Sequence, residues 1–197
     1  MKTVILYISA LFIFLSQSSP VFSGQNDGEL SAEEIYKRYS NAVVFIFTYD
    51  EVMNLISFGS GVIVSPDGII YTNHHVVDGS SYIKIKQGTV NYDSVKIVSI
   101  DKDNDAAILK ISYNGVDYIS VEASRVASIG ETVYSFGNPD GYERTIAKGL
   151  LSGVRSIEGQ DLLQFTASIS PGSSGGALLN CRGKLIGITN SSHDFDR

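Results

Sequence analysis

The sequence predicts an all-β protein folded as a barrel or a sandwich. Beyond residue 40 the apolar runs are short and rich in Val, Ile, Phe and Tyr, and Gly, Asp and Asn separate them. Only one helical pattern is present, and no repeat of about 20 to 50 residues indicates a propeller or a solenoid. Many short strands with little helix are typical of barrels and sandwiches.

The first 23 residues differ in kind from the rest of the chain. Lys2 provides a positive charge, residues 4–15 form an almost unbroken apolar run, and Val21 and Ser23 occupy the minus-three and minus-one positions of a cleavage site. This order is typical of a signal peptide. The run is too short to span a bilayer comfortably, and it lacks the amphipathic period of a buried helix. We therefore expect residues 1–23 to be a signal peptide, and we expect no membrane span after its removal.

A single helix is predicted between this segment and the strands. Ser31 and Glu34 have the spacing of a capping box, in which each residue's side chain accepts a hydrogen bond from the other's backbone N–H. Ile35 and Tyr39 follow as its larger apolar side chains. We expect residues 24–41 to form an N-terminal arm that contains this helix.

Eleven short strands are predicted in two series. A linker at residues 114–130, which includes Asn114-Gly115, separates them. The unit of residues 42–113 contains six strands and the unit of residues 131–197 contains five, so the second series is one strand shorter. The predicted strands are residues 42–49, 56–64, 69–72, 82–87, 94–100 and 106–112, followed by 131–136, 145–156, 161–167, 176–180 and 184–190.

Composition and charge exclude several classes of function. The net charge is −6, and Lys and Arg are scattered singly, which argues against a nucleic-acid partner. No HExxH motif or spaced Cys/His cluster is present, so no metal or other cofactor is expected. Cys181 is the only cysteine and lies beyond a Gly-rich loop, so we expect a partly buried structural residue there and not a catalytic thiol.

Two segments of the first series carry residues suited to acid–base chemistry. His74 and His75 follow a short strand, where a rigid scaffold can aim an imidazole as a general base. Taken alone, such a histidine is more often a solvated or core residue. Asp105 adjoins the apolar run of residues 106–111, where a carboxylate needs a hydrogen-bond partner such as an imidazole N–H. A turn-capping aspartate is the alternative.

The second series contributes a loop that reads S-I-S-P-G-S-S-G-G-A-L-L-N over residues 168–180. Its glycines permit backbone angles that turn successive N–H groups inward, so that they can hold an oxyanion while a neighbouring serine attacks a carbonyl. Taken alone, the segment is more typical of a tight turn. With it, however, the chain has the order His, Asp, Ser found in two-barrel serine proteases, with spacings of 30 and 69 residues. This order places the site at the seam between the two halves.

Five motifs read, in chain order, GSGVIV from Gly59, DGIIYTNHHVV from Asp67, DAAILKI from Asp105, FGNP from Phe136 and PGSSGGALLN from Pro171. Together they resemble the high-temperature-requirement (HtrA/Deg) family of trypsin-like serine proteases, over roughly residues 31–191. The resemblance implies two antiparallel β-barrels of the six-stranded type. The second would lack its last strand, of Gly-x-Gly-Phe-Ala-Ile-Pro type, and would expose an edge.

The same resemblance implies residue roles. The catalytic residues would be His75, which precedes the Val-Val pair, Asp105, and Ser174, which precedes the Gly-Gly pair. The backbone N–H groups of Gly172, Ser173 and Ser174 would form the oxyanion hole. Ile169 would line the primary specificity pocket and favour small or medium apolar side chains before the scissile bond. An extended substrate would pair with the backbone of Gly187, Ile188, Thr189 and Asn190.

The leading expectation is a periplasmic or secreted serine endopeptidase that acts on unfolded or exposed polypeptides. No PDZ domain is expected after residue 190, and the stretch after Asp50 is too short for a long regulatory loop. Relatives also commonly assemble as trimers, so a homo-oligomer is a further expectation. Two alternatives remain: a catalytically weak peptide-binding relative, and an interaction module whose open barrel edge pairs with another chain.

Overall fold

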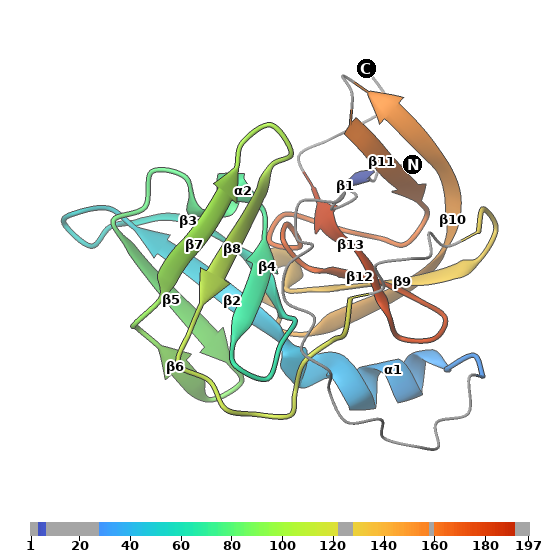
Figure 1. The fold of residues 1–197 in the computed structure, drawn as a ribbon, viewed down its shortest axis with the longest axis horizontal. Coiled ribbons are helices and arrows are strands. Elements are labelled where there is room, and N and C mark those ends of the chain that lie inside the picture. The colour runs from blue at the N-terminus through green and yellow to red at the C-terminus, as the bar shows by residue number, and fades with distance from the viewer. Residues whose placement is uncertain (1–3, 7–27, 122–127, 158–159, 192–197) are drawn as a thin grey trace.

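The structure, a computed structural model, describes residues 4–6, 28–121, 128–157 and 160–191. Strands dominate it and form two antiparallel sheets that lie side by side, which confirms the predicted all-β fold (Figure 1). Most of the predicted signal peptide and the end of the tail lie outside the described residues. No helix in the described part has the length and apolar character needed to cross a membrane.

The N-terminal helix forms where its capping residues predict it. Helix α1 is Ala32–Tyr39, and Ser31 caps it: the Ser31 hydroxyl accepts from the Glu34 N–H at 3.2 Å, and the Glu34 carboxylate accepts from the Ser31 N–H at 2.8 Å. These hydrogen bonds, the one from the Ser31 backbone first, lower the pKa of Glu34. Ile35 is fully buried on the inner face of α1. The helix then passes through the 3₁₀ turn Ser40–Ala42 into the first strand of the large sheet.

The first half forms a seven-stranded sheet with the order β6-β5-β2-β3-β4-β8-β7. All six predicted strands are present, and the short β6 is an addition that its polar sequence, V-N-Y, did not indicate. Val44, Ile46, Ile70 and Leu109 are among the fully buried residues of its core. Its elements are β2 Val43–Tyr49, β3 Leu55–Ile63, β4 Ile69–Thr72, α2 His74–Val77, β5 Tyr82–Gln87, β6 Val90–Tyr92, β7 Lys96–Asp101 and β8 Ala106–Lys110.

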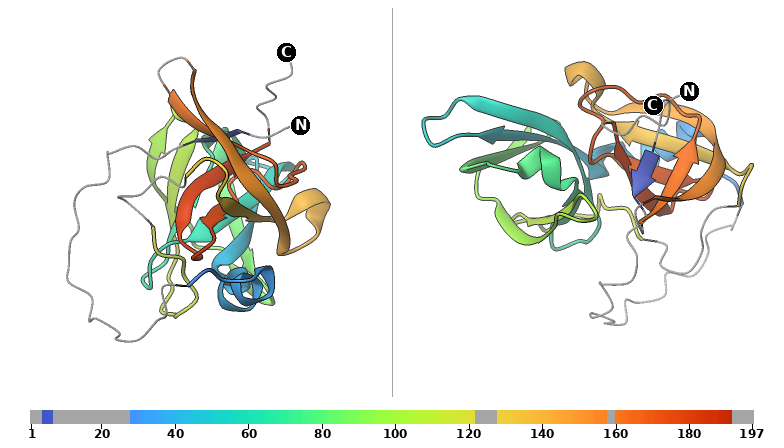
Figure 2. Two further views of the ribbon diagram at one scale, coloured as in Figure 1. Left: turned by 90° about the vertical axis from the view of Figure 1, so that its right-hand side faces the viewer. Right: turned by 90° about the horizontal axis from the view of Figure 1, so that it is seen from above.

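The second half forms a closed barrel with the order β1-β11-β10-β9-β12-β13. Residues 131–197 contribute five strands, as predicted, and the sixth position is occupied by β1, Val4–Leu6, from the predicted signal peptide (Figures 1 and 2). The edge that the sequence predicts to be exposed is therefore covered in this structure. The other elements are β9 Thr132–Gly137, the 3₁₀ helix η2 Pro139–Gly141, β10 Thr145–Ile157, β11 Gln160–Phe165, β12 Ala177–Asn180 and β13 Leu185–Asn190.

Residues 119 and 120 of the predicted linker make hydrogen bonds to both halves. Ile119 is fully buried, and its N–H donates to the carbonyl of Ile63 in the first sheet at 2.9 Å. The carbonyl of Ser120 accepts from the N–H of Leu185 in the second barrel at 3.2 Å. These contacts help to hold the two halves together across the seam where the candidate site lies.

Candidate active site

Two hydrogen bonds join His75, which follows β4, to Asp105, which precedes β8. The short helix α2 presents His75, and Asp105 lies directly before β8. The Asp105 Oδ2 atom lies 2.7 Å from His75 Nδ1, and Oδ1 accepts from the His75 backbone N–H at 2.9 Å. A carboxylate on Nδ1 orients the imidazole and leaves Nε2 to accept a proton. The pairing predicted from the sequence is therefore present in the geometry.

Further contacts hold the backbone and the carboxylate of Asp105. Its φ is 46°, in the left-handed region that is uncommon for residues other than glycine. Its carbonyl accepts from the His74 N–H at 3.1 Å and from the Asn73 side chain at 3.0 Å. The Asn190 side-chain amide, at the end of β13, donates to Asp105 Oδ2 at 2.9 Å. The sequence assigns Asn190 to substrate binding, whereas the structure places its side chain on the carboxylate.

Ser174 lies in a loop whose backbone must approach the first sheet closely. Its carbonyl accepts from the Ser60 N–H on β3 at 2.7 Å, and the next N–H, of Gly175, donates to the Thr189 carbonyl at 2.8 Å. Gly175 has a φ of 82°, and a Cβ there would overlap the Ser60 carbonyl oxygen and the Thr72 hydroxyl. Only glycine satisfies both conditions, which explains the Gly that follows the serine.

The Ser174 hydroxyl is hydrogen-bonded to Ser191 and not to His75. Its Oγ lies 2.6 Å from the Ser191 Oγ and accepts from the Ser191 N–H at 3.2 Å. Within the described residues no hydrogen bond joins Ser174 to His75, although both line one cleft. The sequence did not single out Ser191. In this structure the Ser174 hydroxyl therefore faces Ser191 and makes no hydrogen bond with the imidazole.

Of the three N–H groups predicted to form the oxyanion hole, the one of Ser173 is already used in the loop. The Ser173 N–H donates to the Ser170 carbonyl at 2.9 Å, so the turn itself uses it. Gly172 has a φ of 92°, which glycine adopts without steric penalty. In the part of the chain described, the N–H groups of Gly172 and Ser174 have no hydrogen-bond partner. They are the two donors left for an oxyanion.

A buried polar brace joins the loop to both halves. The Ser60 hydroxyl donates to the Gly172 carbonyl at 2.7 Å and accepts from the Asn138 N–H at 2.9 Å. The Asn138 side chain donates in turn to the Val44 carbonyl at 2.9 Å. Ser60 and Asn138 are almost fully buried, and they belong to the GSGVIV and FGNP motifs, in which neither was predicted to have a role. The available signal was Ser60, a polar residue inside the buried part of β3.

His75 and Ser174 line a cleft of about 410 Å³. One wall comes from the start of β3, where Leu55, Ile56 and Phe58 are 52%, 44% and 40% exposed. This apolar wall was not predicted from the sequence. The complete lining is Leu55, Ile56, Ser57, Phe58, His75, Pro171, Gly172, Ser174 and Ser191.

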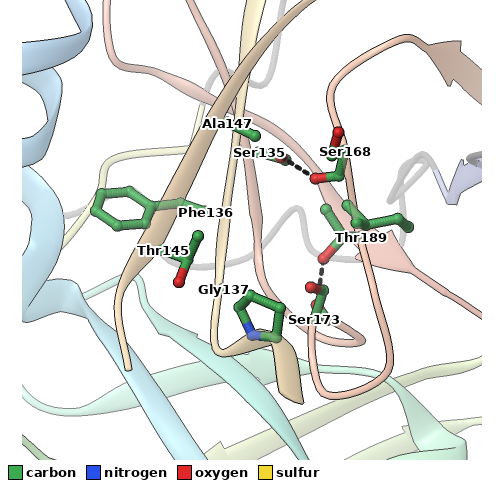
Figure 3. Close-up of a pocket in the computed structure, with 10 residues that line it drawn as sticks. Ser135, Phe136, Gly137, Thr145, Ala147, Ser168, Ser173 and Thr189 are labelled. Carbon is green, nitrogen blue, oxygen red and sulfur yellow. Dashed lines mark hydrogen bonds between the residues drawn. The ribbon is translucent and has the colours of Figure 1, made fainter. Parts of the chain in front are cut away.

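A separate pocket of only about 20 Å³ is lined in part by Ser168 and Ser173 of the same loop (Figure 3). Ile169 lines it, and two hydrogen bonds cross its border: from the Ser135 hydroxyl to the Ser168 carbonyl, and from the Thr189 hydroxyl to the Ser173 carbonyl. Such a volume holds about one water molecule. In this structure Ile169 therefore borders a space too small for a substrate side chain.

The residues predicted to pair with substrate lie inside the barrel wall. Ile188 pairs with Ala177 of β12 and with Leu6 of β1, and Thr189 pairs with Ile5 of β1. Ile188, Thr189 and Asn190 are buried. Residues 187–190 thus do not present an open edge while β1 is in place, and Ser191 is the residue after β13 that lines the cleft.

Cys181 is expected to resist alkylation in the native protein. It is a free, buried thiol, and burial, followed by its hydrogen bond to Glu131, raises its pKa to about 11. A raised thiol pKa keeps the unreactive protonated form below that pH. At pH 8 the lower thiolate fraction alone should slow reaction with iodoacetamide about 100-fold relative to the urea-unfolded chain. Mass spectrometry would measure the rate of alkylation. Equal rates for the native and the urea-unfolded chain would contradict a buried, structural role for Cys181.

Known proteins of similar sequence and structure are serine endoproteases. Residues 59–188 match the family described as "Trypsin-like peptidase domain". The chain is 35% identical over 136 residues to a "Probable periplasmic serine endoprotease DegP-like" of Pseudomonas savastanoi pv. phaseolicola, covering 67% of this chain and 28% of the relative. It is 33% identical over 189 residues to "Serine endoprotease DegS" of Escherichia coli K12, covering 90% of this chain and 53% of the relative.

A solved structure is similar as well. The crystal structure of the serine endoprotease from Yersinia pestis has a TM-score of 0.72 and 34% sequence identity, and the match covers 81% of this chain and 57% of that chain. The chain spans about half of the length of these relatives or less.

Proposed function

Because the chain belongs to the trypsin-like peptidase family and its protease domain is of the HtrA/Deg type, we propose that it is an exported serine endopeptidase that cleaves unfolded or exposed polypeptides. One observation carries the proposal. His75 and Ser174 line the same cleft, and Asp105 holds His75 through both its ring and its backbone N–H. The similar proteins described as periplasmic support export.

The proposed reaction is acyl transfer through Ser174. The hydroxyl leaves Ser191, turns toward His75, and attacks a peptide carbonyl while Nε2 of His75 takes its proton. The N–H groups of Gly172 and Ser174 stabilise the oxyanion of the tetrahedral intermediate. His75 then returns the proton to the leaving amine, and a water molecule hydrolyses the acyl-enzyme with His75 again as the base.

The proposed substrate is an extended, apolar stretch of polypeptide. The β3 wall of Leu55, Ile56 and Phe58 offers apolar surface directly beside Ser174. Ile169, in the same loop as Ser174, supports a preference for small or medium apolar side chains before the scissile bond, and we expect its small pocket to widen when substrate binds. Backbone pairing with substrate would begin at Ser191, beyond the last residue of β13.

A fluorophosphonate probe and unfolded casein test the proposal. The wild-type chain should be labelled and should cleave casein, and Ser174→Ala should abolish both. Ser173→Ala is the matched control: its hydroxyl only accepts a weak 3.3 Å hydrogen bond from the Ser170 N–H, so labelling should persist. A well-folded wild type that is not labelled would rule out the endopeptidase. Labelling that is kept in Ser174→Ala but lost in Ser173→Ala would rule out Ser174 as the nucleophile.

The contact between Ser191 and Ser174 favours a second candidate, a peptide-binding relative with little activity. In that case the cleft would bind peptide while Ser174 stays turned away from His75. Binding of unfolded casein by a folded but unlabelled wild type would identify this second function.

Ser191→Ala is expected to accelerate labelling of Ser174. The substitution removes the 2.6 Å hydroxyl contact, and a net hydrogen bond of about 1 kcal/mol corresponds to a rise of about fivefold in the second-order rate with the probe. Ser168→Ala, on the same loop, removes an exposed hydroxyl and should leave the rate unchanged. A slower rate in Ser191→Ala would show that Ser191 assists the nucleophile and does not restrain it.

A further inference from the structure

Two peptide planes separate the N–H groups left for an oxyanion, those of Gly172 and Ser174, and both planes are held through their carbonyls. The Gly172 carbonyl accepts from the Ser60 hydroxyl at 2.7 Å. The Ser173 carbonyl accepts from the Thr189 hydroxyl (Figure 3). The C=O and N–H of one peptide lie in a single plane, so a donor on the carbonyl also fixes the direction of the N–H. The two hydroxyls therefore fix how the two oxyanion donors are spaced.

The hydroxyl hydrogen of Ser60 is directed to Gly172 because Asn138 occupies both acceptor positions of the same oxygen. The Asn138 backbone N–H donates to it at 2.9 Å, and the Asn138 side-chain amide donates at 3.1 Å. A hydroxyl has one hydrogen and two lone pairs, so only its hydrogen is left for the Gly172 carbonyl. The Asn138 amide is oriented in turn, because its Oδ1 accepts from the Arg144 N–H at 2.9 Å.

This buried polar brace of Ser60 and Asn138 is closed to solvent and joined to two strands of the first sheet. Ser60 is 0% exposed and Asn138 is 1% exposed, so water does not compete for their hydrogen bonds. The Asn138 side chain also donates to the Val44 carbonyl of β2 at 2.9 Å. The Ser60 N–H, on β3, donates to the Ser174 carbonyl at 2.7 Å. A fully bonded buried network of this kind is rigid.

We propose that Ser60, oriented by Asn138, is a positioning residue for the oxyanion site. The inference rests on the proposed function, because an oxyanion forms only when Ser174 attacks a carbonyl. Ser60 acts through the peptide that joins Gly172 to Ser173. Gly172 has a φ of 92°, and glycine leaves this peptide freer to turn than any other residue would. Without the Ser60 hydroxyl, only the bond from the Ser173 N–H to the carbonyl of residue 170 would hold it.

Hydrogen exchange of single amides, measured by NMR, tests the brace without turnover. In the Ser174→Ala background, which prevents self-cleavage, Ser60→Ala should raise the exchange rate of the Ser173 N–H at least about tenfold. The Gly175 N–H is the internal control. Its peptide keeps the hydrogen bond from the Ser60 backbone N–H, which the substitution does not remove, so its rate should stay unchanged. Unchanged exchange at Ser173, or an equal rise at both amides, would overturn the proposal.

Steady-state cleavage of casein by chains that retain Ser174 measures the catalytic consequence. In Ser60→Ala, kcat should fall about 10- to 100-fold, up to the loss that follows removal of a whole oxyanion donor, while KM stays within about twofold. Tyr134→Phe is the matched control, because it also removes a buried hydroxyl that donates to a backbone carbonyl, that of Leu30 at 3.2 Å. Its kcat should equal that of the parent. A Ser60→Ala chain with the kcat of the parent would overturn the positioning role alone.

Asn138→Asp is a second variant of nearly the same shape. An ionised carboxylate has no hydrogen to donate, so the Ser60 hydroxyl would turn toward it and release the Gly172 carbonyl. Exchange at Ser173 and kcat should then change as in Ser60→Ala. A folded Asn138→Asp chain with parent values of both would overturn the role of Asn138. A parent chain that is inactive, although its exchange responds as expected, would overturn the proposed endopeptidase and the positioning role with it.

Discussion

Asp105→Asn is expected to lower kcat for peptide cleavage by about 10⁴-fold while the protein stays folded. In the parent protein the Asp105 carboxylate accepts hydrogen bonds from His75 Nδ1, from the His75 backbone N–H and from the Asn190 side chain. An asparagine has one acceptor oxygen and one donor amide, so it cannot accept all three. The amide turned toward Nδ1 would favour the imidazole tautomer that cannot take the proton of Ser174.

Steady-state cleavage of an unfolded protein, together with thermal unfolding, measures this effect. Asp103→Asn is the matched control, because that residue is an exposed neighbour of Asp105 in the same turn and the same charge is removed. Its kcat should stay within about twofold of the parent. A similar loss of kcat in both variants would show that the charge of the turn matters and not the hydrogen bonds to His75.

Gly175→Ala is expected to lower the free energy of unfolding by about 3–5 kcal/mol and to abolish labelling of Ser174. Two effects add at this position. The φ of 82° strains any residue with a Cβ, and the Cβ would overlap the Ser60 carbonyl oxygen and the Thr72 hydroxyl. The loop would have to move away from β3, and with it the N–H groups that face the cleft.

Urea unfolding followed by circular dichroism separates these two effects. Gly79→Ala is the control, because Gly79 has a φ of 68° but no atom lies within 4 Å of the position of a Cβ. It should therefore lose only the strain contribution, about 1–2 kcal/mol. If both variants lose the same stability, the contact with β3 does not explain the glycine.

Features that depend on residues close together in the chain were predictable. The capping box of Ser31 and Glu34 joins residues three positions apart, and the helix begins where it predicts. The strands after residue 40 follow from short apolar runs between turn residues, and among them only the polar β6 was missed. β1, within the predicted signal peptide, was not predicted as a strand. The pairing of His75 with Asp105 was predictable too, because a carboxylate beside an apolar strand needs a hydrogen-bond donor.

Contacts between distant residues could not be read in this way. Asn190 and Asp105 are 85 positions apart, and nothing in the sequence around either residue indicates that the amide binds the carboxylate. Ser173 was predicted to donate to the oxyanion, but the turn uses its N–H, and which amides a loop leaves free depends on the φ and ψ angles of all its residues. Ser191 lies next to Ser174 only because β13 brings it there.

The sequence by itself determined the fold class, the HtrA/Deg type of the protease domain and the three residue types of the candidate site. These properties are carried by side-chain identity and spacing within short segments. The tertiary structure alone decided how the second barrel closes. Backbone N–H and C=O groups pair with any extended strand whatever its side chains, so the five strands of the second half leave a gap that the sequence cannot assign. In the folded chain the gap between β11 and β13 is filled by Val4–Leu6.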